Sequence, residues 1–279
     1  MWFACARGDM LKRVTSAQTL ERLSAICAEV GFPLARGEAS LIERLRLLAA
    51  HTETVADCER MVASARKVFR YYEATKPLDA FTESERQIVV LGCVFSDIGK
   101  TGPRSADASG QRLVVEMFAV ERVGDDKQTV AHFMKTYFVT DAEERLRRFA
   151  ALGLEPSITI REFWNLHSTW TLEIMEAGGV PPAVVAAAAT HHLLDNINPK
   201  AIVGADRRFT RAFGDNVAFD RAEKLIILLD KYDAVRRRGG QTHEQAICWL
   251  RKRVASVPYF SADEELLTLI ADLDAALQS

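Results

Sequence analysis

Apolar residues recur at helical spacing along most of this chain, and that pattern most constrains how it can fold. Between residues 55 and 72 they follow steps of three, four, three, four and three, which places them on one face of a helix. This face consists of Val55, Cys58, Val62, Ala65, Phe69 and Tyr72. Alternating, strand-like patterns are scarce, and the best strand candidate, LVVEMFAV at 113–120, fits a helix equally well. The sequence therefore predicts an all-α protein.

Capping residues indicate where several of these helices begin and end. Thr82 with Glu85 three positions later forms a capping box ahead of RQIVVLGCVF, a segment that is apolar on nearly all sides and is predicted to be buried. Pro181-Pro182 opens the segment PAVVAAAATHHLL, and Gly239-Gly240 ends RAEKLIILLDKYDAVRR. The carboxy-terminal ADEELLTLIADLDAALQ is again amphipathic. Helices thus account for all the strongly patterned segments.

With 279 residues, the chain is long enough for one large domain or two small ones. We expect residues 1–40 to form an N-terminal helical extension and residues 41–279 to form a helical bundle. An insertion at about 103–160 is expected within that bundle, because PRSADASGQ and the charged VERVGDDKQ separate two segments rich in unusual ionisable residues. The insertion is a candidate cover for a pocket.

Composition excludes several classes of function. A net charge of -2 gives no reason to expect a broad nucleic-acid-binding surface. No run approaches the ~18 apolar residues of a membrane span, and the first residues lack the apolar core of a secretory signal. The five cysteines are dispersed and odd in number, which indicates reduced thiols and a cytoplasmic protein. They are Cys5, Cys27, Cys58, Cys93 and Cys248.

Ionisable side chains interrupt the apolar helices at five places. A buried carboxylate or imidazole is costly unless it has a hydrogen-bond partner, a counter-charge or a metal ion. Any one of them alone is more often a hydrogen-bonded core residue than a ligand, but four histidines and two aspartates together indicate a site. Imidazole nitrogens and carboxylate oxygens suit iron, manganese, zinc or nickel, and helices of a bundle can direct such ligands inward. The candidates are His51, Asp97, His167, His191, His192 and Asp230, whereas His132 and His243 lie in unremarkable patterns.

The order of these residues resembles that of the HD-domain metal-dependent phosphohydrolases. That family has a first histidine, as at His51, then a His-Asp pair often followed by Ile-Gly-Lys, as in SDIGK at 96–100, and a distal aspartate, as at Asp230. The HD-GYP branch of cyclic-dinucleotide phosphodiesterases adds a histidine like His167 in NLHSTWTLEIM and a pair like His191-His192.

Two further segments extend the resemblance to the HD-GYP branch. DKYDA at 230–234 is similar to its Asp-x-Tyr-Asp-Ala motif, and RRRGGQTHEQAI at 236–247 is similar to its basic stretch followed by His-Glu-x-Ala. The resemblance covers roughly residues 45–100 and 160–250 and implies an HD-domain-like helical bundle.

The chain also departs from the family pattern. Ser96 stands where the family has the histidine of the His-Asp pair, and a hydroxyl is a poor ligand for a divalent transition metal. Leu47 stands where some members carry a glutamate that supports a further metal ion. After the histidine pair, LLDNINP keeps Asp195 and Pro199 but lacks the Gly-Tyr-Pro signature, which weakens the case for a cyclic dinucleotide as substrate.

The resemblance implies a role for each candidate residue. The implied ligands of one or two divalent ions (Fe, Mn, Ni or Zn) are His51, Asp97, His167, His191 and Asp230. Asp97 would bridge two ions and contact the attacking water, and Lys100 would neutralise charge on the phosphate. His192, Arg236 and Arg237 would help to bind the substrate, although a basic helix end is also favoured by the helix dipole alone. The implied reaction is hydrolysis of a phosphoester in a nucleotide or another phosphorylated small molecule.

A catalytically inactive HD-fold pseudoenzyme is the alternative. Such a chain would bind metal weakly or not at all and would act as a ligand-binding or protein-interaction module, with a protein partner or a second copy of itself. Loss of the family histidine at Ser96 and of the Gly-Tyr-Pro turn favours this reading. Retention of so many polar residues in apolar helices favours a metal-dependent phosphohydrolase, unless those residues persist as a hydrogen-bonded network.

Overall fold

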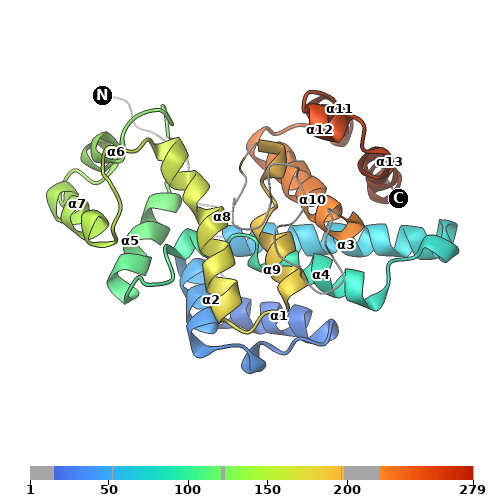
Figure 1. Cartoon of the computed structure of the whole chain (residues 1–279), viewed down its shortest axis with the longest axis horizontal. Coiled ribbons are helices and arrows are strands. Elements are labelled where there is room, and N and C mark those ends of the chain that lie inside the picture. Colours follow the sequence, from blue (N-terminus) through green and yellow to red (C-terminus); the bar gives the residue numbers. More distant parts are fainter. Residues whose placement is uncertain (1–15, 52, 121–122, 196, 198–219, 279) are drawn as a thin grey trace, which may run out of the picture.

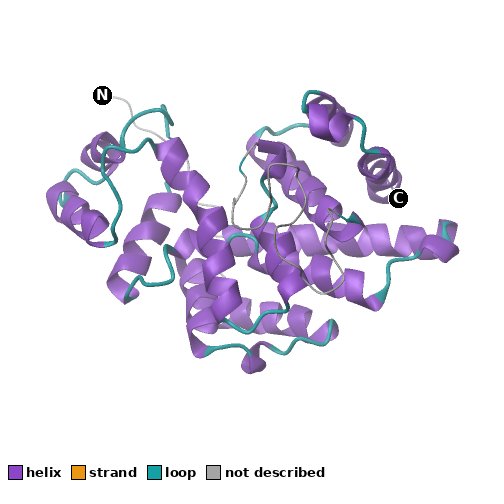
Figure 2. Ribbon diagram, in the orientation of Figure 1, coloured by secondary structure: helices purple, strands orange, loops and turns teal. Residues whose placement is uncertain are grey.

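The computed structural model describes residues 16–51, 53–120, 123–195, 197 and 220–278. Within these ranges every regular element is a helix, and the only β-type pairing is an isolated bridge between Thr129 and Thr159 (Figures 1 and 2). The prediction of an all-α protein is confirmed. The first half comprises α1 (Ser16–Glu29), η1 (Leu34–Arg36), α2 (Ala39–His51), α3 (Thr54–Thr75), η2 (Pro77–Asp79), α4 (Glu83–Phe95), η3 (Ile98–Thr101), α5 (Ala108–Phe118) and α6 (Val130–Tyr137). The second half comprises α7 (Ala142–Ala151), α8 (Ile160–Ala177), α9 (Pro182–Ala189), η4 (Leu193–Asp195), α10 (Arg221–Arg238), α11 (His243–Ala255), α12 (Pro258–Ser261) and α13 (Glu264–Gln278).

The caps expected from the sequence are formed. The Glu85 backbone N–H donates to Thr82 Oγ1 at 3.2 Å, and the Thr82 N–H donates back to Glu85 Oε2 at 2.8 Å. Pro182 is the first residue of α9, and Gly239 follows the last residue of α10. Of the two alternatives for 113–120, the helix is the one formed, because most of that segment lies in α5 with four buried apolar side chains.

Helix α9 ends earlier than its apolar pattern indicates. Ala189 is its last residue, and the Thr190 hydroxyl donates to the carbonyl of Ala186 at 2.8 Å. His191 and His192 therefore lie in the turn between α9 and η4 rather than within a helix. This turn lets two adjacent side chains face the same region, which neighbours on a helix cannot do.

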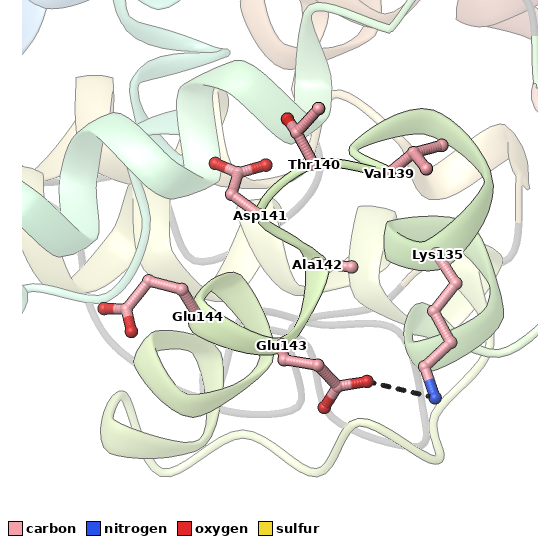
Figure 3. Close-up of a pocket in the computed structure, with 7 residues that line it drawn as sticks. All are labelled: Lys135, Val139, Thr140, Asp141, Ala142, Glu143 and Glu144. Atoms are coloured by element: carbon pink, nitrogen blue, oxygen red, sulfur yellow. Dashed lines mark ion pairs between the residues drawn. The ribbon is translucent and has the colours of Figure 1, made fainter.

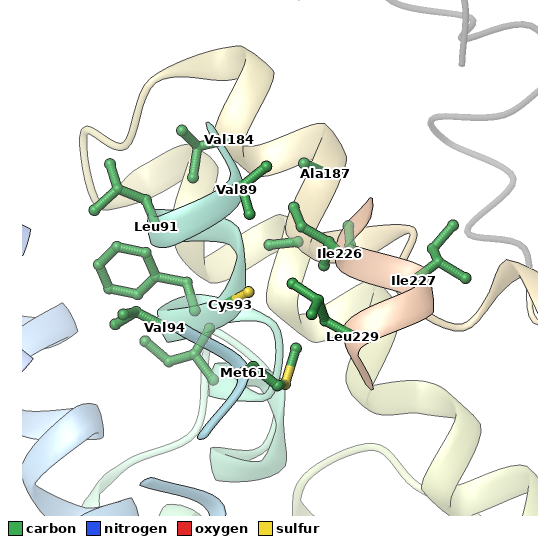
Figure 4. Close-up of a cluster of buried hydrophobic side chains, with 14 of the residues drawn as sticks. Met61, Val89, Leu91, Cys93, Val94, Val184, Ala187, Ile226, Ile227 and Leu229 are labelled. Carbon is green, nitrogen blue, oxygen red and sulfur yellow. The ribbon is translucent and has the colours of Figure 1, made fainter. Parts of the chain in front are cut away.

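The core is built around α4, which contacts α3, α9 and α10. Residues 88–95 of α4 are all buried, as expected for a segment that is apolar on all sides. A Cβ at Gly92 would lie 2.3 Å from Cδ1 of Ile226, so the absence of a side chain allows α10 to approach closely. Figure 4 shows the apolar side chains of α4 meeting Val184 and Ala187 of α9 and Ile226 and Leu229 of α10. Residues 96 and 97 directly follow the buried end of α4 and are themselves buried.

The segments expected to be additions pack on this core. In the described part of 1–40, α1 contacts α2 and α4, and Leu23 and Cys27 are fully buried. In the segment 103–160, α5 contacts α2 and η3, while α6 and α7 pack together at one end of the molecule (Figure 1). Cys58 and Cys93 are buried thiols, and Cys248 is exposed; Cys5 lies outside the described residues. Among the described helices, none is long and apolar enough to cross a bilayer.

Candidate metal centre

The turn that carries Asp97 is clamped against α8. The Gly99 N–H donates to Thr171 Oγ1 at 3.0 Å, and the Thr171 hydroxyl donates to the carbonyl of Ser96 at 2.9 Å. A Cβ at Gly99 would lie only 1.9 Å from the carbonyl oxygen of His167, so only glycine allows η3 to sit this close to the helix. Thr171 follows His167 by one helical turn, so the same face of α8 holds the turn and presents His167 to it.

His167 and His191 are oriented in the same way by backbone carbonyls. Nδ1 of His167 contacts the carbonyl of Trp164, and Nδ1 of His191 lies 2.6 Å from the carbonyl of Ala188. A carbonyl only accepts hydrogen bonds, so each Nδ1 carries the ring proton and each Nε2 presents a lone pair. These two Nε2 atoms lie 3.2 Å apart. A backbone carbonyl that fixes the tautomer in this way is the usual support for a metal-binding histidine.

Asp97 completes the set of convergent lone pairs. Its Oδ1 lies 3.5 Å from His167 Nε2 and 3.8 Å from His191 Nε2. Three electron-rich atoms without a hydrogen among them repel one another, and a cation between them would convert the repulsion into coordination. Together with His192, these residues offer ligand atoms that all lie within 4.8 Å of one another. This buried Asp/His cluster could hold a metal ion, and its nitrogen and oxygen donors fit a divalent transition metal.

The ionisation states also suit a metal ligand set. Burial lowers the pKa of His167 to about 3 and lowers the pKa of His191, against the attraction of Asp97. Burial alone would raise the pKa of Asp97, but Lys100, His167 and His191 together hold that pKa well below its usual range. At neutral pH the cluster therefore has the protonation states that metal binding requires, with neutral imidazoles and an ionised carboxylate.

Lys100 reaches the opposite oxygen of Asp97. Its Nζ lies 2.7 Å from Asp97 Oδ2, one turn along η3, and both side chains are largely buried. Asp97 therefore directs Oδ1 at the histidines and Oδ2 at an ammonium group. The role of Lys100 toward a phosphate stays a prediction.

Ser96 contributes no ligand atom to the cluster. Its hydroxyl donates to the carbonyl of Cys93 in the last turn of α4 at 3.3 Å, and its side chain is buried. The donor set that the described residues form is therefore independent of the position where the family histidine is missing.

Asp230 lies beside the histidines but is held by a second lysine. Its Oδ2 is 3.8 Å from His192 Nδ1 and 2.8 Å from Nζ of Lys231. Burial would lower the pKa of Lys231, but Asp230 and Asp195 outweigh it, so the pKa is raised and the ammonium is retained. Sequence reasoning missed Lys231, although it follows Asp230 directly in an apolar helix.

His51 is the last residue of α2, and its side chain lies outside the described part of the chain.

Sequence reasoning missed Arg44, which also belongs to α2. It is a buried arginine, and burial lowers its pKa to about 10. It donates to Thr101 Oγ1 at 2.7 Å and to the carbonyls of residues 101–104 at 3.0–3.3 Å. Arg44 therefore ties the end of η3 to α2, in addition to the contacts of η3 with α8. The sequence did contain a signal that Arg44 is buried, since Arg44 stands between Leu41 and Leu45 on an apolar face.

The basic end of α10 is engaged elsewhere. Arg237 donates to Asp57 Oδ2 at 2.6 Å, and Arg236 donates to the carbonyl of Gln241 at 2.6 Å. Burial raises the pKa of Asp57 to about 6, opposed first by Arg237, while the charge of Asp97 adds to the rise. The two arginines are thus tied to local partners rather than gathered at the histidines, and their substrate-binding role stays a prediction.

A surface depression lies apart from these residues, between α6 and α7 (Figure 3). Its lining contains one ion pair, between Lys135 and Glu143 at 3.3 Å. The lining residues are Lys135, Val139, Thr140, Asp141, Ala142, Glu143 and Glu144. None of them is a predicted site residue, so the depression has no bearing on the metal centre.

Comparison with known proteins does not assign this chain to a family. No protein-family model, no curated protein and no solved structure matches this chain. The HD-type relationship therefore stays a prediction that rests on the order of motifs in the sequence.

Proposed function

We propose that this chain is an HD-type metal-dependent phosphohydrolase that acts on a nucleotide-type phosphoester. The observation that carries the proposal is the convergence of two imidazole Nε2 atoms and Asp97 Oδ1, with both imidazole protons held on backbone carbonyls. Asp97, His167 and His191 would hold one divalent ion. Iron, manganese, nickel and zinc all accept this donor set.

The chemistry assigned to the site follows from the charges of its residues. When bound, a divalent ion would supply positive charge for a phosphoryl oxygen and lower the pKa of a nearby water molecule. Lys100, on the far oxygen of Asp97, provides a second positive charge within reach of an anion. Asp97 accepts a hydrogen bond from the attacking water, but its depressed pKa makes it a weak base, so it orients that water.

The pseudoenzyme remains the second candidate, and two observations favour it. Ser96 turns its hydroxyl to the last turn of α4, and Asp230 is neutralised by Lys231. Both residues correspond by motif order to ligands of the family. A chain of this kind would bind a metal ion or an anion at the cluster without hydrolysing a phosphoester.

Metal analysis with a hydrolysis assay tests the proposal. We expect the purified protein, grown with added metals, to retain a full equivalent of divalent ion and to hydrolyse a member of a phosphomonoester and phosphodiester panel. Asp97→Asn should abolish hydrolysis, whereas Asp79→Asn, at an exposed aspartate of η2, should not. Metal retention without hydrolysis of any panel member would favour the pseudoenzyme, and absence of both would refute the enzyme.

The Ser96→His variant provides a second test of the phosphohydrolase. If the cluster descends from a centre that used a histidine at this position, restoring the imidazole should raise the hydrolysis rate. An unchanged rate in a folded, metal-loaded variant would show that activity does not depend on that position.

A further inference from the structure

Lys231 is a buried lysine at the centre of a polar cluster that the proposed chemistry does not use. Its Nζ is 2.5 Å from Asp195 Oδ2, 2.8 Å from Asp230 Oδ2 and 2.6 Å from His192 Nδ1. The side chain is only 7% exposed. An ammonium group has three hydrogens to donate and no lone pair. Its contact with His192 Nδ1 has hydrogen-bond geometry, and its contacts with Asp195 and Asp230 are ion pairs.

This arrangement determines where His192 carries its proton. A proton on Nδ1 would face the ammonium hydrogens at 2.6 Å, which places donor against donor. Nδ1 therefore accepts, and the ring proton is on Nε2. His192 is the opposite tautomer of His167 and His191, whose Nδ1 atoms face carbonyls. The 3.1 Å contact between His192 Nδ1 and Asp195 Oδ2 is then a contact of two acceptors that share one ammonium donor.

The ring of His192 lies beside the metal centre. Its ring centroid lies 4.0 Å from that of His191 and 4.9 Å from that of His167. With Nδ1 engaged by Lys231, Nε2–H is the remaining polar group of the ring. A protonated ring nitrogen has no lone pair for a metal ion but can donate a hydrogen bond to an anion. The position of His192 would suit a metal ligand, and it is this tautomer that removes the residue from the ligand set.

We infer that Lys231 is a positioning residue whose ammonium takes the place of a second metal ion between Asp195 and Asp230 and keeps His192 as a hydrogen-bond donor. The centre then binds one divalent ion through Asp97, His167 and His191. His192 Nε2–H donates to a phosphoryl oxygen of the substrate. The substrate class rests on the proposed function, whereas the ion count and the tautomer do not.

The tautomers can be measured in the metal-free protein by two-bond nitrogen–hydrogen NMR correlations of the imidazole rings. We expect Nδ1–H for His167 and His191 and Nε2–H for His192. In Lys231→Met, Asp195 becomes the nearest partner of His192 Nδ1, so we expect His192 to switch to Nδ1–H. Nδ1–H in the wild-type protein, or no switch in a folded variant, would overturn the inference.

Metal stoichiometry provides an independent measurement. We expect one equivalent in the wild-type protein and in His192→Gln, and two equivalents in Lys231→Met, where Asp195 and Asp230 lose their ammonium partner. His192→Gln should lower kcat by about 100-fold, as removal of one preorganised donor does, with metal affinity unchanged. A second equivalent in the wild-type protein, or metal loss in His192→Gln, would contradict the inference.

Lys224 supplies a matched control on the same helix. It is also a buried lysine held by two carboxylates, Asp263 at 2.9 Å and Glu265 at 2.8 Å, neither of which is in the metal centre. Lys224→Met should leave both the His192 tautomer and the ion count unchanged. The wild-type measurements decide the inference even where a variant fails to fold.

The outcomes separate this inference from the proposed function. One equivalent and Nε2–H on His192 without hydrolysis would refute the phosphohydrolase and keep the role of Lys231. Hydrolysis with two equivalents, or with Nδ1–H on His192, would refute the role of Lys231 and keep the phosphohydrolase. Absence of metal from the wild-type protein would overturn both.

Discussion

His167 Nε2 lies 3.2 Å from His191 Nε2, although the opposite nitrogen of each ring is tied to a carbonyl one turn back in the chain. Neither facing atom carries a hydrogen, so this contact is repulsive in isolation. The two residues are 24 positions apart, on α8 and in the turn after α9. Packing of these two elements therefore maintains an arrangement that a cation would stabilise.

Removal of one of these ligands should weaken metal binding. We expect His167→Gln to lower metal affinity at least about 100-fold, because even loss of an outer partner of a ligand costs 10–100-fold. Competition with a chromophoric chelator would measure the affinity. His132→Gln, at an exposed histidine of α6, should bind metal like the wild-type protein. Equal affinity of the two variants would exclude His167 as a ligand.

The metal-free protein should lose stability in acid. The folded-state pKa of His167, about 3, is below its unfolded value of 6.5, so the unfolded state binds more protons between these values. The stabilisation is complete above pH 6.5 and is lost as the pH falls toward 3. One such histidine contributes a slope of up to about 1.4 kcal/mol per pH unit.

Urea denaturation with chelator at pH 7, 6 and 5 would measure this slope. Asp57 acts in the opposite direction, because its folded-state pKa of about 6 exceeds its unfolded value of 3.8, so its protonation favours the folded state as the pH falls through 6. Comparison of His167→Gln with His132→Gln isolates the histidine contribution. A slope that is the same in both variants would show that His167 is not buried in its neutral form.

Glycine at position 99 should be required for the centre to assemble. In Gly99→Ala the new methyl group would meet the backbone carbonyl of His167, which cannot rotate away, so we expect destabilisation of about 3 kcal/mol. Gly124→Ala is the matched control, since a Cβ there would have no neighbour within 4 Å, and should change stability by less than about 0.5 kcal/mol. Urea denaturation would measure both, and a stable Gly99→Ala protein would contradict the observed approach of η3 to α8.

Arg44 of α2 should support the same turn. Arg44→Lys keeps a charge but loses the planar fork that reaches several carbonyls at once, so we expect a loss of about 2–3 kcal/mol in stability. Arg46→Lys, on the same helix but exposed and paired with Glu43, should be nearly neutral. Equal thermal unfolding midpoints of the two variants would exclude this role for Arg44.

Much of the local structure followed from the sequence. The Thr82–Glu85 cap and the full burial of the segment after it are consequences of residues within one or two helical turns. The segment 113–120 stayed open between strand and helix, because its apolar residues do not follow one clear period, and packing of α5 on α2 and η3 selects the helix. The early end of α9 was missed, since its apolar pattern continues past Ala189 to Leu194.

The sequence by itself determined that this chain is helical and which side chains are candidates for a metal centre. Only the tertiary structure decided that Asp97, His167 and His191 converge, that Asp230 meets Lys231 beside His192, and that Arg237 is taken by Asp57. Helical periodicity and capping depend on neighbours a few residues apart. The partners within the centre are up to 94 residues apart, as with Asp97 and His191, so their proximity depends on how helices pack.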